Sequence, residues 1–124
     1  MKLGNKKAAF LFLLIPSITW ANEISREQWM QGMSNALPTA FCQADQYFRA
    51  CFRVTPQECE TTALSTVRVC LENAKAKIPA TLDQPKDGTH WGSIIGQCAG
   101  ESYEIALKKK RIDSKKCNNP DNWK

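Results

Sequence analysis

A helical spacing of apolar residues begins just after a capping motif. Ser25 and Gln28 form a capping box, in which each side chain accepts from a backbone N–H that the first helical turn leaves free. Ile24 and Trp29 occupy the two positions of a hydrophobic staple around this box. The pattern predicts a first helix over about residues 26–35.

Three phenylalanines form a second apolar stripe after Pro38, which should end or kink the first helix. At 100° per residue, Phe41, Phe48 and Phe52 fall within about 40° of one another. This stripe predicts the core face of a second helix.

The clearest helix boundary lies at Thr55. Its hydroxyl can accept from the backbone of Glu58, Glu58 can reach back to the cap, and Pro56 suits the first helical position because it has no N–H to leave unpaired. A third helix is expected from Pro56 to about residue 77, antiparallel to the second across a tight turn. Its buried seam recurs at steps of four and three, at Cys59, Ala63, Val67, Cys70, Ala74 and Ile78.

The segment 80–92 contains Pro85 and Asp87-Gly88 without a clear period, which predicts a long loop. Thr89 is the expected cap of a fourth helix that runs to about Arg111. In this helix a glycine stands at every fourth position. Because each costs a helix about 1 kcal/mol relative to alanine, we expect another element to approach closely. The glycines are Gly92, Gly96 and Gly100.

These segments predict an all-α fold. The expected architecture is a small four-helix bundle, stapled by disulfides and built on the antiparallel hairpin of the second and third helices. Residues 22–124 should form one domain with a basic C-terminal tail from about residue 108.

The first 21 residues have the pattern of a secretory signal peptide. Three lysines precede the apolar run Ala8 to Ile15, and the small-residue pattern Thr19-Trp20-Ala21 follows. The alternative of a membrane anchor is disfavoured, because spanning a bilayer takes about 20 apolar residues. We expect an exported protein, periplasmic or secreted.

An even number of cysteines in a small exported chain predicts three disulfides. Zinc is the competing interpretation, but the sequence lacks a CxxC pair and contains a single histidine, so no metal and no cofactor are expected. The cysteines are Cys42, Cys51, Cys59, Cys70, Cys98 and Cys117.

Matching heights across the predicted hairpin favour one pairing among the fifteen possible. The favoured pairs are Cys51–Cys59, Cys42–Cys70 and Cys98–Cys117. Cys42 and Cys51 fall on opposite flanks of the second helix, which leaves Cys42–Cys98 with Cys70–Cys117 open.

Charge divides the chain into an acidic body and a basic tail. Residues 22–104 hold seven Lys and Arg against ten Asp and Glu, whereas residues 105–124 hold seven against two.

Lysines in the last turn of a helix complement its dipole, which explains one or two of the lysines in the tail. The remainder favour an anionic partner, and Trp123 could sit among lipid headgroups. The predicted binding residues are Lys108, Lys109, Lys110, Arg111, Lys115, Lys116 and Trp123. Nucleic acid is disfavoured by export and by the lack of interleaved aromatics.

Catalysis is not expected. With the cysteines in disulfides, His90 is the one side chain that could act as a base near neutral pH. Asp87, Thr89 and His90 lie close in the sequence, but a turn, a helix cap and cover for the end of the bundle explain them.

Three segments resemble small six-cysteine, helical exported proteins of Gram-negative bacteria. They are FRACF (residues 48–52), IGQCAGESYE (residues 95–104) and RIDSKKC (residues 111–117). This resemblance covers about residues 40–117 and implies a disulfide-stapled helical protein without a known active site. The size and build are also similar to small substrates of type II secretion, some of which act at host membranes through anionic lipids.

The sequence therefore predicts an exported, non-catalytic binding protein, in the manner of a secreted effector, and a monomer. Phospholipid or phosphoinositide headgroups are the expected partner, bound through the basic cluster. The alternative is a periplasmic inhibitor, immunity protein or chaperone that binds another protein through the glycine face or the His90-Trp91 loop.

Overall fold

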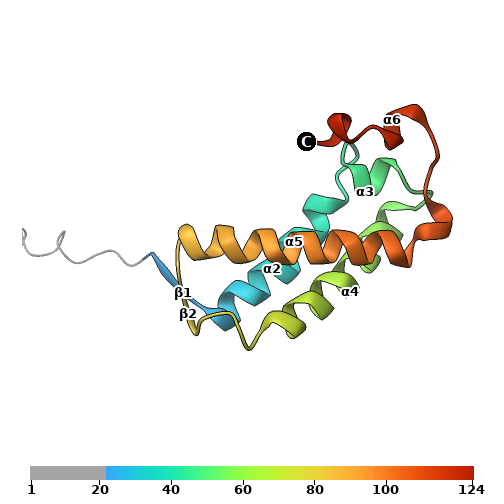
Figure 1. Ribbon diagram of the computed structural model, residues 1–124. Coiled ribbons are helices and arrows are strands. Elements are labelled where there is room, and N and C mark those ends of the chain that lie inside the picture. Colours follow the sequence, from blue (N-terminus) through green and yellow to red (C-terminus); the bar gives the residue numbers. More distant parts are fainter. Residues whose placement is uncertain (1–21) are drawn as a thin grey trace, which may run out of the picture.

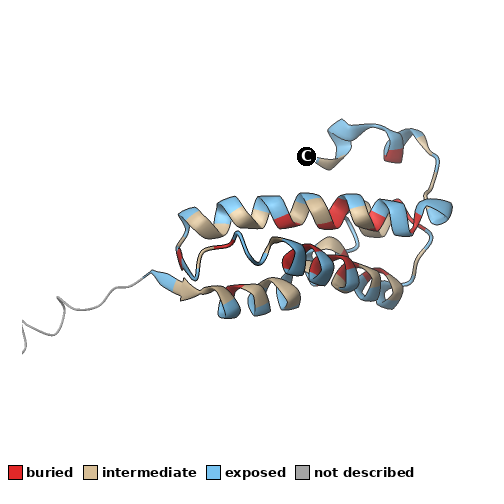
Figure 2. Cartoon of the chain, turned by 60° about the horizontal axis from the view of Figure 1, so that its bottom comes forward, coloured by how far each residue is buried: buried red, intermediate tan, exposed pale blue. Residues whose placement is uncertain are grey.

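The computed structural model describes residues 22–124. The predicted signal peptide, residues 1–21, lies outside the described residues. Three long helices form the body: α2 (Arg26–Phe41), α4 (Pro56–Ala74) and α5 (Lys86–Ala106), with α4 packed against both of the others (Figure 1). Buried positions lie on the sides of the helices that face one another (Figure 2). The fold is helical and disulfide-stapled, as predicted, but residues 22–124 form three long helices in place of the four expected.

The start of α2 confirms the capping box. The Ser25 hydroxyl accepts from the backbone of Gln28, and the Gln28 side chain accepts from the Ser25 N–H. Trp29 is buried in the core, and Ile24 packs against the same cluster. The predicted end of this helix was wrong, because α2 continues through Pro38 to Phe41. Pro38 is buried, and the apolar residues on either side of it contact the core, which offsets the lost backbone hydrogen bond.

The predicted second helix does not form. Cys42 caps the end of α2, and the chain then makes only the short helix α3 (Tyr47–Ala50). Phe41 and Phe48 nevertheless stack with their ring centroids 4.4 Å apart, and Phe52 is 2% exposed. The stripe was thus correctly assigned to the interior, but contacts between separate elements bring its rings together.

The boundary at Thr55 is confirmed, since its hydroxyl accepts from the Glu58 N–H and Pro56 is the first residue of α4. The Glu58 carboxylate, expected to return to the cap, instead pairs with Lys110. The predicted seam forms the inner face of α4, where Cys59, Ala63 and Val67 are fully buried.

The predicted long loop is replaced by a strand and the first turns of a helix. Strand β2 (Thr81–Asp83) pairs antiparallel with β1 (Glu23–Ser25), and Ile24 lies opposite Leu82. Helix α5 begins at Lys86, so Thr89 lies inside it and is not the cap. Leu82 is fully buried and fixes this segment against the core. A single buried residue is enough for this, although the apolar residues of the segment do not recur at a regular spacing.

All six cysteines form disulfides, but both sequence-based sets of pairs were wrong. The bonds are Cys42–Cys59, Cys51–Cys117 and Cys70–Cys98. Since α2 runs on to Phe41, Cys42 emerges beside the start of α4. The short α3 then leaves Cys51 beside the C-terminal segment, and Cys70 faces α5. The sequence-based pairs came from the positions of the cysteines along a continuous second helix. They were wrong because that helix is absent.

Candidate anion-binding surface

The predicted basic cluster begins where α5 ends. The helix stops at Ala106, earlier than the predicted Arg111, and the 3-10 turn η2 (Lys108–Lys110) follows the capping residue Leu107. The three lysines of η2 are exposed. Together with residues 105–107 they line a surface hollow of about 470 Å³.

Backbone hydrogen bonds fix this turn to the segment after α3. Phe52 and Arg111 form an antiparallel bridge. The Arg53 N–H donates to the Lys110 carbonyl at 2.8 Å, and the Ile112 N–H donates to the Cys51 carbonyl at 2.8 Å. The exposed Arg53 therefore lies beside the cluster, a neighbour that the sequence did not indicate because it is 57 residues before Lys110.

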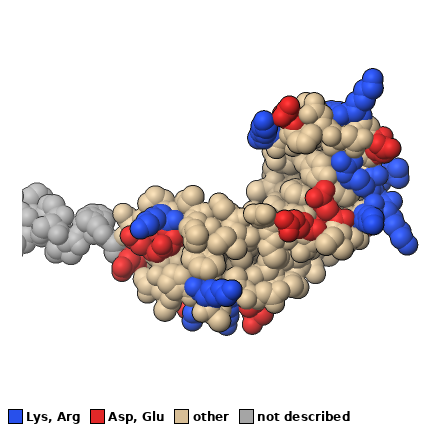
Figure 3. All heavy atoms as spheres, viewed as in Figure 1, with Lys and Arg blue, Asp and Glu red and all other residues tan. Residues whose placement is uncertain are grey.

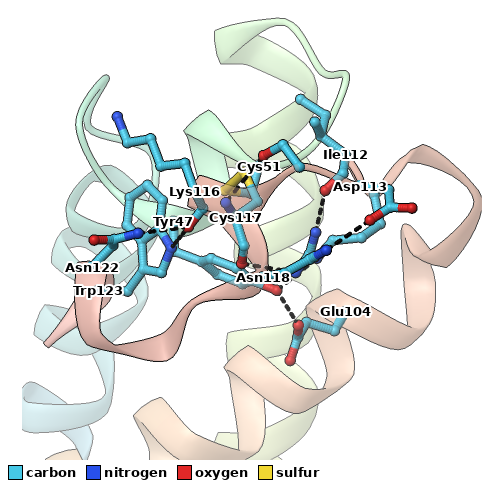
Figure 4. The surroundings of a disulfide bond; sticks show 12 residues. Tyr47, Cys51, Glu104, Ile112, Asp113, Lys116, Cys117, Asn118, Asn122 and Trp123 are labelled. Carbon is cyan, nitrogen blue, oxygen red and sulfur yellow. Dashed lines mark hydrogen bonds between the residues drawn. A yellow bond between two sulfur atoms is a disulfide. The ribbon is translucent and has the colours of Figure 1, made fainter.

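Arg111 serves the packing of the C-terminal segment. Its Nε donates to the Tyr47 hydroxyl at 2.9 Å, its Nη2 donates to the Cys117 carbonyl at 3.0 Å, and its Nη1 donates to the Ile112 carbonyl. The guanidinium lies 5.3 Å from the centre of the Tyr47 ring. Figure 4 shows the surroundings of the Cys51–Cys117 disulfide, where Tyr47, Ile112 and Cys117 lie close together. The donors of Arg111 point into the protein, which leaves few for an external anion.

Tyr47 links this arginine to α5. Its hydroxyl donates to Glu104 Oε1 at 2.5 Å. Burial raises the pKa of the Tyr47 hydroxyl, and the hydrogen bond to the Glu104 carboxylate raises it further, against the opposing effect of Arg111. Tyr47 therefore remains a neutral donor near neutral pH. These residues line one side of a hollow of about 350 Å³, whose other side is formed by residues 117–123.

Trp123 is half-buried in the folded tail. Its Nε1 donates to the Lys116 carbonyl at 3.1 Å, its ring meets the Tyr47 ring edge to face at 5.7 Å, and Lys116 Nζ lies 5.6 Å from its centre. The tail contains the short helices α6 (Lys115–Asn118) and η3 (Pro120–Trp123).

The lysines of the cluster differ in whether they form an ion pair. Lys110 Nζ pairs with Glu58 Oε2 at 2.5 Å. Within residues 22–124, Lys108, Lys109, Lys115 and Lys116 are exposed and have no carboxylate within ion-pair distance. Figure 3 shows basic side chains spread in more than one group over the C-terminal part of the molecule, with acidic side chains between them.

The features of the alternative interpretation are spread along α5. A Cβ added at Gly100 would lie 2.9 Å from Phe48 Cζ, whereas one at Gly96 would meet nothing within 4 Å, so close approach is confirmed at Gly100 alone. His90 is exposed with its ring against Trp91, and Asp87 accepts from the Asp83 N–H.

No helix within residues 22–124 is both long and apolar enough to cross a bilayer. The same residues contain no cluster of three or more metal-ligating side chains.

Three long helices joined with shorter ones by three disulfides around a small core define a class of compact, disulfide-stabilised helical proteins. The chain belongs to the family described as T2SS substrate NttA, whose sequence profile matches residues 23–111. The weaker resemblance to type II secretion substrates is thereby confirmed, and the family is one of exported proteins. No curated protein and no solved structure matches the chain.

Proposed function

We propose that this protein is a non-catalytic secreted effector that binds anionic phospholipid or phosphoinositide headgroups. On this proposal a signal peptide directs it to the periplasm, and type II secretion carries the folded, disulfide-bonded monomer out of the cell. Membership of a type II secretion substrate family supports the export part.

The observation that carries the binding part is the pair of exposed lysines on η2 that have no carboxylate partner within residues 22–124. Lys108 and Lys109 project from a turn that is tied by backbone hydrogen bonds to the segment around Cys51. A rigid support lowers the entropic cost of holding both charges at a membrane. Lys115 and Lys116 form a second group of exposed lysines on a rigid support, because the neighbouring Cys117 is held by its disulfide.

The contacts around the cluster change how much each predicted residue is expected to contribute to anion binding. Under this proposal, Arg111 and Trp123 support the surface and do not bind the anion, because they donate hydrogen bonds to groups of the protein. Lys110 contributes less than its neighbours, since binding an anion competes with its ion pair to Glu58.

The test is sedimentation with vesicles of phosphatidylcholine containing graded phosphatidylserine or phosphoinositide. Each basic residue near an anionic membrane contributes about 1 kcal/mol, so Lys108→Glu with Lys109→Glu should weaken binding by about 30-fold or more. Wild-type binding should also fall steeply as salt rises.

A matched control is available at the other end of the body. Lys75 and Lys77 are exposed just after the end of α4, so Lys75→Glu with Lys77→Glu makes the same change in net charge away from η2. The control should reduce binding much less. Equal losses in both variants would mean that net charge acts without a site. Salt-insensitive binding to another protein, with no vesicle binding, would favour the inhibitor or chaperone alternative.

A further inference from the structure

Ile105 is the most exposed of the large hydrophobic side chains in residues 22–124. It is 77% exposed, whereas Val69 on α4 is 55% and Ile94 on α5 is 40% exposed. A single exposed isoleucine is common on protein surfaces, so its position decides whether it matters.

The core holds Ile105 pointing outward. Tyr103 is fully buried, and its hydroxyl donates to the Phe48 carbonyl at 2.7 Å. Leu107 is 9% exposed and belongs to the same core cluster. Because Tyr103 and the capping residue Leu107 are four residues apart, both lie on the inner side of the end of α5, and the residue midway between them faces away from that side.

Ile105 also shares its surface with the exposed lysines of η2. It lines the same hollow as Lys108, Lys109 and Lys110. An apolar tip beside cationic side chains suits the boundary between lipid headgroups and acyl chains, where lysine stems also lie along apolar surface. Trp123, the apolar anchor expected from the sequence, is engaged with Tyr47 and Lys116.

We propose that Ile105 inserts into the acyl boundary of an anionic bilayer while Lys108 and Lys109 contact the lipid phosphates. This inference rests on the proposed function and makes it more specific. It commits the site to a bilayer surface, because a free headgroup offers nothing for Ile105 to enter, and it places the C-terminal end of α5 against the membrane.

Two substitutions should move vesicle binding in opposite directions. Ile105→Ser removes the inserted apolar area and should weaken partitioning between about threefold and tenfold. Ile105→Trp should strengthen it, because tryptophan favours the membrane interface. Val69→Ser, the matched control on α4, should leave binding unchanged. Binding of soluble inositol phosphate, measured by calorimetry, should be the same in the wild type and in Ile105→Ser.

Vesicles that contain brominated lipids give a direct readout of insertion. The indole introduced by Ile105→Trp should be quenched when the protein is bound, in excess of the quenching seen for the wild-type tryptophans. Wild-type binding with no effect of either substitution and no added quenching would overturn insertion and leave headgroup binding intact. Absence of wild-type binding to anionic vesicles would overturn both proposals.

Discussion

Arg111 and Lys109 are two residues apart and carry the same charge, but their surroundings differ. Arg111 is half-buried and donates to Tyr47 and to the Cys117 carbonyl, while Lys109 is exposed without a carboxylate partner within the described residues. Burial and hydrogen bonding, which charge does not reveal, therefore separate a residue that holds the tail from one that is available to a partner.

Arg111→Ala should lower the free energy of unfolding by about 2 kcal/mol, because it removes hydrogen bonds from a charged donor and leaves the part-buried Cys117 carbonyl without this partner. Lys109→Ala should change it by less than about 0.5 kcal/mol, as expected for an exposed side chain. Urea denaturation with the disulfides intact measures both. Equal effects would contradict the structural role given to Arg111.

At the scale of elements, α5 shows that equally spaced glycines need not serve the same purpose. Gly100 is buried against Phe48, whose ring also meets Phe41, Tyr47 and Tyr103. Gly96 faces open space. The short α3 thus packs on α5 at one position of the glycine stripe, and this contact joins the body to the segment that supports η2.

Gly100→Ala should destabilise the protein by about 1–2 kcal/mol, because the new methyl group must displace a ring held on several sides. Gly96→Ala is the matched control on the same helix. It should stabilise by up to about 1 kcal/mol, since alanine favours a helix and meets no neighbour. Thermal unfolding of the two variants gives the comparison, and destabilisation by both would contradict it.

At the scale of the whole molecule, the disulfides divide their roles between the body and the tail. Cys70–Cys98 joins α4 to α5, and Cys42–Cys59 joins the end of α2 to the start of α4. Cys51–Cys117 closes the longest loop, with a sequence separation of 66 residues, and holds the C-terminal segment against α3. Cys51 and Cys117 pack in the core cluster around Phe52 and Tyr103, which is separate from the cluster around Trp29, Val67 and Ile95.

Replacing Cys51 and Cys117 together by alanine should therefore release the tail while the body stays folded. The loss in the free energy of unfolding should be up to about 4 kcal/mol, from the loop that the bond closes. Hydrogen exchange should show lost protection in residues 112–124 and retained protection in α4 and α5. Global loss of protection would show that the tail is part of one cooperative unit.

Local sequence determined much of this protein. The capping box at Ser25, the cap at Thr55 and the seam of α4 depend on residues within four positions of one another, and the structure confirms them. The cysteine count determined that three disulfides form. The basic cluster was also visible in the sequence, although its binding role remains a proposal.

Only the tertiary structure decided the disulfide pairs, the continuation of α2 past Pro38 and the availability of each basic residue. Each depends on groups far apart in the chain: Cys51 with Cys117, the core contacts beside Pro38, and Arg111 with Tyr47. The outward position of Ile105 likewise follows from the burial of Tyr103 and Leu107. Periodicity reports which face of a segment is apolar, but packing energy between segments decides which partner that face meets.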